Sequence, residues 1–325
     1  MEKWAAIDIG SNTVQLLVTQ STVGSQRAEV EASREKDGLP LFTEPLFHAL
    51  HTTRLGASST PNQLAAERVA DTLAVLKEYR NILLRQEVAA VRVIATSAVR
   101  DATNKDVLIQ AVRELCGWQV EVLSGQEEAH ISFLGAAEQA LKRNARHFLL
   151  LDIGGGSSEL IRWRDGLLNA VSANVGAVRA QMAHWQANEI ERELSAVIKA
   201  KDDDITAYVL GAGGTITTAA AILLGCREYS REAVDGYCLK AENVDELLEM
   251  LRPLSISERC AFLPLLARRG EIIWEGLLIL RAFFRLLSLP CLTVSAGGVL
   301  QGCLLDLKQR GLSPMNRIDE GKGLR

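Results

Sequence analysis

The sequence lacks the charge pattern of a nucleic-acid-binding protein. Its 325 residues include 36 Lys and Arg against 40 Asp and Glu, which gives a formal net charge of −4. Nucleic-acid-binding domains usually present a basic surface, and this chain has no run of five like charges. With 48% hydrophobic and 23% charged residues, it has the composition of an ordinary folded protein. Disordered, collagen-like and coiled-coil chains are excluded, and we expect no DNA partner.

Signals for export and for a membrane span are also missing. The first six residues have neither the basic region nor the apolar run of a signal peptide. Residues 205–226 carry no charge and are long enough to cross a bilayer. Their centre is rich in glycine and threonine, however, so we predict a buried strand, a glycine turn and a helix. We therefore expect a soluble, cytoplasmic protein with no membrane partner.

Cysteine occurs without the spacing of a metal site. The chain has no Cys-x-x-Cys pair and no histidines at zinc spacing. Most of the cysteines have apolar neighbours in sequence, which is typical of reduced core cysteines. We predict a structural role for all six: Cys116, Cys226, Cys238, Cys260, Cys291 and Cys303.

Motifs of several enzyme classes are absent. There is no G-x-x-x-x-G-K-[ST] loop, no G-x-S-x-G and no H-E-x-x-H, and residues 211–216 lack the last glycine of G-x-G-x-x-G. Phosphate chemistry in this chain would therefore depend on backbone amides, acidic residues and a hard cation.

What the sequence does contain is an internal repeat. An apolar strand ending in Asp-Ile-Gly occurs at residues 4–10 and again at 147–154, each followed closely by a second strand. Helices are predicted over 61–86, with Thr-Pro as its start, and over 104–116, with a strand at 91–95 between them. This alternation predicts an α/β protein of two similar domains with mixed sheets. We place these domains at 1–123 and 124–325, with the last helix packing back on the first domain.

Two glycine turns are the candidate phosphate sites. Residues 154–158 read Gly-Gly-Gly-Ser-Ser after a buried strand, and consecutive amides of such a loop form a concave nest for an anion. A tight hairpin turn needs only one or two glycines, so three favour ligand binding. The turn Gly10-Ser11-Asn12 is ambiguous alone, and its pairing with the second loop favours a site there too.

Acidic residues stand next to both turns. Asp152 ends a buried strand, where an unpaired carboxylate is costly. Asp8, Asp152 and Glu159 are therefore candidate ligands of Mg²⁺, directly or through water, because Mg²⁺ prefers carboxylate and phosphate oxygens. For Glu159, an outward-facing strand position is the alternative.

Two further residues stand out by position. Ser124 and Glu127 have the spacing of a capping box, which gives Glu127 a structural role. Glu128 has no such role, and it is either catalytic or simply favoured at a helix start by the dipole. Arg100 follows a buried strand and is either a surface ion-pair partner or a phosphate-binding group.

Together these motifs resemble the exopolyphosphatase and guanosine pentaphosphate phosphohydrolase (Ppx/GppA) family, which belongs to the actin, Hsp70 and sugar-kinase superfold. The resemblance covers nearly the whole chain, and the Gly-Gly-Gly-Ser loop with the upstream Ser-Gly-x-Glu-Glu-Ala is specific to the family. The matching segments are residues 6–12, 95–100, 123–129, 151–160, 211–215 and 234–239. The resemblance implies two ribonuclease H-like domains that close over an interdomain cleft.

The resemblance also implies an activity and its residues. The expected function is metal-dependent removal of the terminal phosphate from inorganic polyphosphate, with Mg²⁺ or Mn²⁺ held by the acidic residues above. Glu128 would orient or deprotonate the attacking water, with Arg100 at the phosphates. The other phosphate ligands would be Ser11, Asn12, Gly154, Gly155, Gly156 and Ser157. A nucleotide substrate would need a base pocket at Gly211, Gly213, Gly214 and Thr215.

Some alternatives stay open on the sequence. Guanosine pentaphosphate is an alternative substrate, and a non-catalytic nucleotide or polyphosphate sensor is an alternative function. Where the family usually reads Ser-Asp-x-x-Leu-Arg-Glu-Gly, this chain has Ala296, Leu300 and Gln301 in place of the acid, the arginine and the glutamate. Substrate preference and activity are therefore not determined by the motifs. The apolar stretch 272–289 is either core or a homodimer face.

Overall fold

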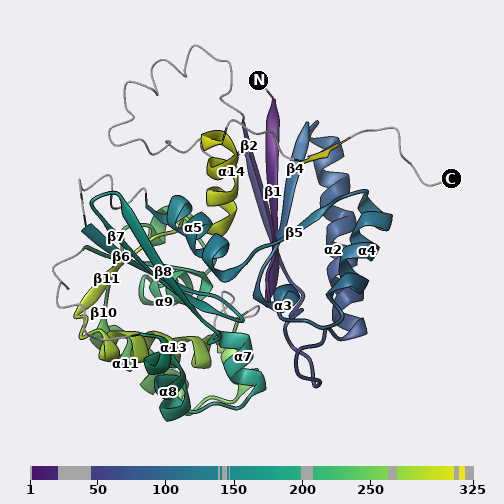
Figure 1. The fold of residues 1–325 in the computed structure, drawn as a ribbon. Helices are drawn as coiled ribbons and strands as arrows, with labels where there is room; N and C mark the ends of the chain where they lie inside the picture. Colours follow the sequence, from purple (N-terminus) through teal and green to yellow (C-terminus); the bar gives the residue numbers. More distant parts are fainter. Residues whose placement is uncertain are drawn as a thin grey trace. The chain divides into compact units, whose positions relative to one another are not determined.

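The computed structural model describes residues 2–20, 45–137, 140, 145, 147–198, 208–262, 269–310 and 315–318 (Figure 1). The chain divides into two compact units. Unit 1 consists of residues 1–124 and 299–325, and unit 2 of residues 125–298. Unit 1 is therefore discontinuous in sequence, because its last helix and strand follow the whole of unit 2.

Unit 1 is a mixed sheet with helices on both faces. The sheet runs in the order β12-β4-β1-β2-β3, and β5 also pairs with β4. Figure 1 shows α2 and α4 on one side of this sheet and α14 on the other. The strands are β1 (Lys3–Ile9), β2 (Thr13–Gln20), β3 (Phe47–Thr52), β4 (Ala90–Ala95), β5 (Val120–Val122) and β12 (Asn316–Arg317). The helices are α2 (Ala66–Arg85), α3 (Ser97–Arg100), α4 (Lys105–Cys116) and α14 (Val299–Gln309).

Unit 2 has a second mixed sheet in the order β10-β11-β9-β6-β7-β8. Its strands are β6 (His147–Ile153), β7 (Ser158–Arg164), β8 (Leu167–Ala173), β9 (Tyr208–Ala212), β10 (Cys238–Lys240) and β11 (Cys291–Val294). Its helices are α5 (Gly125–Ala136), α7 (Ala177–Met182), α8 (Ala187–Val197), α9 (Gly214–Leu223), α10 (Arg231–Val234), α11 (Ala241–Leu251), α12 (Ile256–Phe262) and α13 (Ile273–Leu286).

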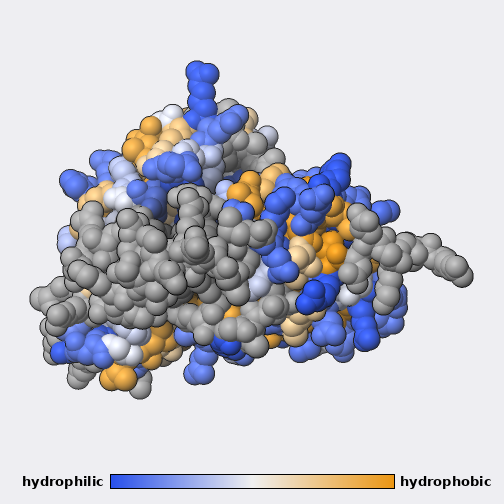
Figure 2. Space-filling view, turned by 90° about the horizontal axis from the view of Figure 1, so that it is seen from above, coloured by the Kyte–Doolittle hydropathy of each residue, from blue (hydrophilic) through white to orange (hydrophobic). Residues whose placement is uncertain are grey.

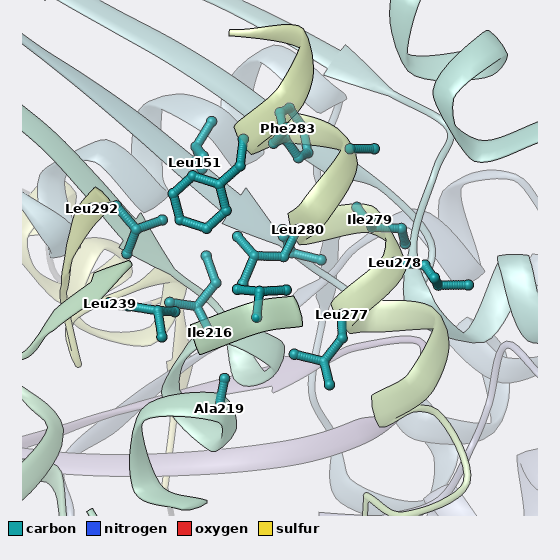
Figure 3. Close-up of a cluster of buried hydrophobic side chains, with 14 of the residues drawn as sticks. Leu151, Ile216, Ala219, Leu239, Leu277, Leu278, Ile279, Leu280, Phe283 and Leu292 are labelled. Atoms are coloured by element: carbon teal, nitrogen blue, oxygen red, sulfur yellow. The ribbon is translucent and has the colours of Figure 1, made fainter. Parts of the chain in front are cut away.

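The apolar stretch 272–289 lies largely in the core of unit 2. It forms α13, whose Leu277, Leu280 and Phe283 are buried with Leu151 of β6 (Figure 3). Burial of such side chains contributes about 1.5–3 kcal/mol each. This helix is therefore a main source of the stability of unit 2.

The internal repeat is present in three dimensions. In unit 1, β1 pairs with β2 in antiparallel fashion, and the Gly10 amide donates to the Thr13 carbonyl at 3.0 Å. In unit 2, β6 pairs with β7 in the same way, and the Gly154 amide donates to the Ser157 carbonyl at 3.0 Å. Each unit thus begins its sheet with the same strand, turn and strand, and the predicted α/β class with two similar sheets is confirmed.

The sequence predicts the start of one helix at the wrong residue. The helix expected over 61–86 begins only at Ala66. Asn62 has a φ of 53°, outside the helical region. The Leu64 amide and carbonyl bond instead to the side chain of Asn104 at 2.8 and 3.0 Å. Because these bonds hold the segment to the start of α4, it cannot join α2. The strand at 91–95 and the helix at 104–116 are confirmed as β4 and α4.

The uncharged stretch 205–226 forms β9, a glycine turn and α9 over its described part, as predicted, and residues 205–207 lie outside that part. Within the described ranges, no helix has both the length and the hydropathy needed to cross a bilayer. On the face seen in Figure 2, hydrophilic residues surround smaller hydrophobic areas.

Candidate active site

The carbonyl groups of the glycine loop of unit 2 accept hydrogen bonds from the segment that follows it in space, α7. The Gly154 carbonyl accepts from the Ala177 amide at 3.1 Å, and the Gly155 carbonyl accepts from the Val178 amide at 2.8 Å. The Gly156 carbonyl accepts from Nε of Arg179 at 2.7 Å. All three carbonyls are therefore used by the start of α7.

The amides of the same loop are left for another ligand. Over the part of the chain that the structure describes, the N–H groups of Gly155, Gly156 and Ser157 donate to no other residue. Consecutive amides of this kind make a concave anion site. The predicted phosphate-binding loop therefore has the hydrogen-bond pattern that such a site requires.

Gly176 allows the loop to lie against α7. A Cβ atom added at Gly176 would lie 2.5 Å from the carbonyl carbon of Gly155 and 2.5 Å from the amide nitrogen of Gly156. Real Cβ atoms do not approach backbone atoms so closely. Sequence reasoning missed Gly176, because an isolated glycine before a helix gives no sign of what it contacts.

In the loop of unit 1, residues 10–12, backbone carbonyl groups likewise accept hydrogen bonds from a neighbouring segment. The Ser11 carbonyl accepts from the Gly56 amide at 2.8 Å, and the Asn12 carbonyl accepts from the Thr53 amide at 3.1 Å. The hydroxyls of Ser11 and Ser97 are 3.0 Å apart. Nδ2 of Asn12 is buried and has no hydrogen-bond partner among the described residues. A buried amide nitrogen of this kind is costly unless it meets an acceptor, so it is available to a ligand oxygen.

Asp8 lies near the end of β1, and Arg100 is the last residue of the short helix α3 in the same unit. Asp8 is buried at the end of β1, opposite Ile94 of β4. Nη1 of Arg100 donates to the Leu123 carbonyl at 3.1 Å, and its Nε lies 3.6 Å from Oδ1 of Asp101. Arg100 is therefore a partly buried, anchored group rather than a fully solvated one.

Three carboxylates of unit 2 form a buried cluster. Asp152 and Glu159 are directly opposite each other on β6 and β7, so their side chains share one face of the sheet. Burial raises the pKa of Glu159 well above its usual value, and the charges of Glu128 and Asp152 raise it further. Glu159 is only 2% exposed, which excludes the outward-facing position. The predicted residues Glu128, Asp152 and Glu159 are thus brought together.

Glu128 and its neighbour Glu127 face different surroundings. Both lie in the first turn of α5, but Glu128 is 8% exposed, whereas Glu127 is exposed. A buried carboxylate at this position needs a function or a partner that offsets its desolvation. The distinction drawn between the two glutamates from the sequence therefore agrees with their burial.

Two serine hydroxyls hold the cluster. Ser132, one turn after Glu128 on α5, donates to Oδ2 of Asp152. Ser172 of β8 donates to Oε1 of Glu159 at 2.8 Å. Burial raises the pKa of Asp152, and the Ser132 hydroxyl acts against this shift by favouring the charged form. The sequence motifs indicated neither serine. Only the four-residue spacing between Glu128 and Ser132 could have shown that Ser132 lies on the same face of the helix.

Helix α5 is further fixed by backbone packing. A Cβ atom at Gly135 would lie 1.9 Å from the Gly298 carbonyl oxygen, and one at Gly125 would lie 2.9 Å from Cβ of Ser172. The Ser295 hydroxyl donates to the Ala136 carbonyl at 3.3 Å. These contacts at both ends of α5 restrict the position of its buried glutamate.

The glycine turn before α9 completes this region. Gly213 has a φ of 89°, and a Cβ atom there would lie 2.6 Å from Oδ1 of Asp152. At Gly214 the added atom would lie 1.9 Å from Nη1 of Arg269. Gly211 instead lies beneath core side chains, and Thr215 packs against Gly276. Of the four residues predicted to border a nucleotide base, Gly213 and Gly214 lie beside the Asp152 carboxylate and the Arg269 guanidinium, respectively. The other two have packing roles.

Arg269 is a residue that the motifs do not indicate. Burial lowers the pKa of its guanidinium, although Tyr229 acts in the opposite direction. Its position against Gly214 at the start of α9 depends on chain contacts across more than fifty residues. No local pattern could have revealed it.

The donor set suits a hard cation. Asp152 and Glu159 offer carboxylate oxygens, which Mg²⁺ prefers, and buried like charges gain from a cation between them. Within the described ranges, no group of three or more His, Cys, Asp and Glu side chains is arranged to hold a metal ion on its own. Asp8 belongs to unit 1, whereas the other two carboxylates belong to unit 2. Asp152 and Glu159 therefore offer the donor type that Mg²⁺ prefers, but the described residues alone do not complete a metal site.

Comparisons with known proteins show which family the chain is similar to. The sequence profile of the Ppx/GppA phosphatase family matches residues 33–310. The chain is 26% identical to "Exopolyphosphatase 2" of Mycobacterium tuberculosis, over 93% of this chain and 98% of that protein. It is 28% identical to "Bifunctional 3-dehydroquinate synthase/phosphatase" of Fusobacterium nucleatum, over 93% of this chain and 46% of that protein.

Solved structures are similar over their whole length. The Ppx/GppA family member of Aquifex aeolicus is 25% identical, with a TM-score of 0.71, and the match covers 95% of this chain and 98% of that one. An exopolyphosphatase from Cytophaga hutchinsonii is 24% identical with a TM-score of 0.79, covering 96% and 99%. The latter likeness concerns the fold alone.

Proposed function

Because the chain belongs to the Ppx/GppA phosphatase family, a family of phosphoanhydride hydrolases, we propose that it is an exopolyphosphatase that releases the terminal phosphate of inorganic polyphosphate. The observation that carries this proposal is the buried cluster of Glu128, Asp152 and Glu159 in the unit that carries the open amides of residues 155–157. The name of the mycobacterial relative supports the choice of polyphosphate.

Glu128 is proposed to accept the proton of the attacking water. The residue is buried on α5, and the contacts of Ser132 and Gly135 fix the position of this helix. Phosphoryl transfer requires little covalent chemistry from the protein, and catalysis comes mostly from positioning and electrostatics. A buried carboxylate that holds the attacking water in line with the bond to the leaving group would supply both positioning and electrostatic stabilisation.

The chain's own residues are proposed to bind and hold the substrate. The amides of Gly155, Gly156 and Ser157 would donate to phosphate oxygens of the terminal unit. Ser11, Asn12 and Arg100 of unit 1 would hold further phosphates, and Nδ2 of Asn12 is the donor that lacks a partner.

Asp152 and Glu159 are proposed to hold Mg²⁺ or Mn²⁺, with Asp8 as a further ligand. When bound, the cation would neutralise charge on the transferring phosphate. The Ser132 and Ser172 hydroxyls support this role, because each donates to one of the two carboxylates and so favours its charged form.

Phosphate release tests the proposed function. The protein would be assayed with Mg²⁺ on long-chain polyphosphate, guanosine pentaphosphate and ATP, with a chelator as the control for the cation. We expect release from polyphosphate that stops when the cation is removed. A strong preference for guanosine pentaphosphate would instead assign the alternative substrate. Binding of polyphosphate without release from any substrate would assign a sensor.

Gly176→Ala is expected to weaken substrate binding. The added methyl group must displace the loop at Gly155 and Gly156, and overpacking of this kind costs about 1–3 kcal/mol. We expect KM for polyphosphate to rise about tenfold, which corresponds to ~1.4 kcal/mol. Steady-state kinetics of phosphate release would measure it.

Gly298→Ala is the matched control for this change, because a Cβ atom there meets no atom within 4 Å. Its KM should equal that of the unchanged protein. If the Gly176 variant is folded and keeps its KM, the loop does not bind the substrate phosphates in the proposed way.

A further inference from the structure

Cys238 and Cys291 lie close together on the edge strand β10 and the adjacent strand β11 of the sheet of unit 2. Strand β10 forms the edge of this sheet and pairs with β11 in antiparallel fashion. Cys238 is opposite Thr293, and Lys240 is opposite Cys291. Opposite residues share a face and successive residues alternate. The two cysteines and Lys240 are therefore on the same face, with the cysteines on one diagonal.

This face points away from the hydrophobic core. Leu239 and Leu292, which lie between these positions along the strands, are 0% and 1% exposed and belong to the core of unit 2. Cys238 is exposed and Cys291 is partly exposed, and both are free thiols. A small oxidant in solution can therefore reach the pair.

The thiols and the ammonium group influence one another directly. Burial raises the pKa of the Cys291 thiol, the neighbouring Cys238 raises it further, and the Lys240 ammonium lowers it. The pKa of Lys240 is raised mainly by its hydrogen bond and ion pair with Glu242, and to a smaller extent by the two thiols. These are short-range effects, and a cation beside a thiol favours the reactive thiolate. Cys116 and Cys303 differ from this pair because both are buried, so an oxidant in solution does not reach them directly.

We propose that Cys238 and Cys291 form a redox-active dithiol, which becomes an intramolecular disulfide on reaction with a low-molecular-weight disulfide such as oxidised glutathione. The site lies outside the carboxylate cluster and the phosphate loops. It therefore does not depend on the proposed function.

The reaction takes two thiol exchanges. The thiolate of Cys238, the more exposed of the two, attacks one sulfur of the small disulfide, forms a mixed disulfide and releases one small thiolate. The thiolate of Cys291 then attacks the sulfur of Cys238 and displaces the second small thiolate. The two cysteines lose two electrons and two protons, and the small disulfide gains them as two thiols.

Oxidation would join the edge strand covalently to β11. Diagonal neighbours on paired strands lie about 7–8 Å apart, so β10 must shift toward β11 as the bond closes. Beyond β11 the chain continues into residues 295–298, where Gly297 packs against Gly135 of α5. A closed loop between the two cysteines restricts the unfolded chain. We therefore expect the oxidised protein to melt at a higher temperature than the reduced protein.

The test compares intact mass and peptide maps after incubation of the reduced, full-length protein with oxidised glutathione. The expected product has lost two hydrogen atoms and yields one cross-linked peptide pair containing Cys238 and Cys291. Cys238→Ser and Cys291→Ser should each abolish this cross-link and leave the other cysteine able to carry glutathione. Cys226→Ser, at a half-buried cysteine elsewhere, should keep it.

Two outcomes would overturn the proposal. One is a protein that carries glutathione on Cys238 without closing the disulfide. The other is a cross-link that persists in the Cys238→Ser variant. Circular dichroism of the reduced variants would verify that each is folded, which is expected because Cys238 is on the surface.

Discussion

Glu128→Gln is expected to lower the turnover number by about 10³-fold while leaving the protein folded. Gln has the same shape as Glu but cannot accept the proton of the attacking water. The side chain is buried beside Glu159, so removal of its charge also relieves repulsion in the cluster. The variant should therefore be at least as stable as the unchanged protein, and it should still bind polyphosphate.

Glu127→Gln is the matched control, because this neighbour is in the same helical turn but is exposed. Its turnover should be unchanged. Phosphate release under saturating substrate measures both variants, and thermal unfolding verifies their folds. Equal turnover in the Glu128 variant and the unchanged enzyme would remove this residue from the reaction.

Arg92→Met is expected to destabilise unit 1 by about 3–5 kcal/mol. Arg92 is 6% exposed and pairs with Glu121 at 2.9 Å and with Asp306 at 2.9 Å. Burial lowers the pKa of its guanidinium, but the bonds to Glu121 and its other partners raise it on balance. Without Arg92, Asp306 remains 2% exposed and keeps only the surface Arg310 as an ion-pair partner among the described residues.

Urea unfolding would measure this loss as a lower midpoint of the transition that reports on unit 1. The double variant Arg92→Met with Asp306→Leu should recover much of it, because no buried charge is then left alone. Arg68→Met, which breaks an exposed pair with Asp71 at 3.3 Å, should change stability by less than about 1 kcal/mol. A midpoint shift for Arg92→Met no larger than that of Arg68→Met would contradict the assigned role.

The sequence was most informative where structure is local. Asp152 and the glycines after it could be recognised because a strand end, a turn and the next strand are adjacent in the chain. Glu128 could be separated from Glu127 because a capping role is a matter of spacing. Both inferences use contacts within a few residues.

The rest depends on residues far apart in sequence. Asn104 prevents residues 61–64 from joining α2 through bonds across forty residues. Arg92 meets Asp306 across 214 residues, and Arg269 lies against Gly214 across more than fifty residues. Such partners are selected by packing, and single-residue patterns contain no information about them.

The division of unit 1 into two stretches of sequence has a consequence during synthesis. Residues 1–124 leave the ribosome first, but the carboxylate of Asp306 that pairs with Arg92 is made only after all of residues 125–298. Until then Arg92 has Glu121 but not Asp306 as an ion-pair partner, and the sheet face that α14 covers is open to water. Domains generally fold as units while the chain grows. Unit 2 can therefore complete its hydrophobic core before α14 has been made. During synthesis, folding of residues 125–298 can thus be complete before folding of unit 1 is.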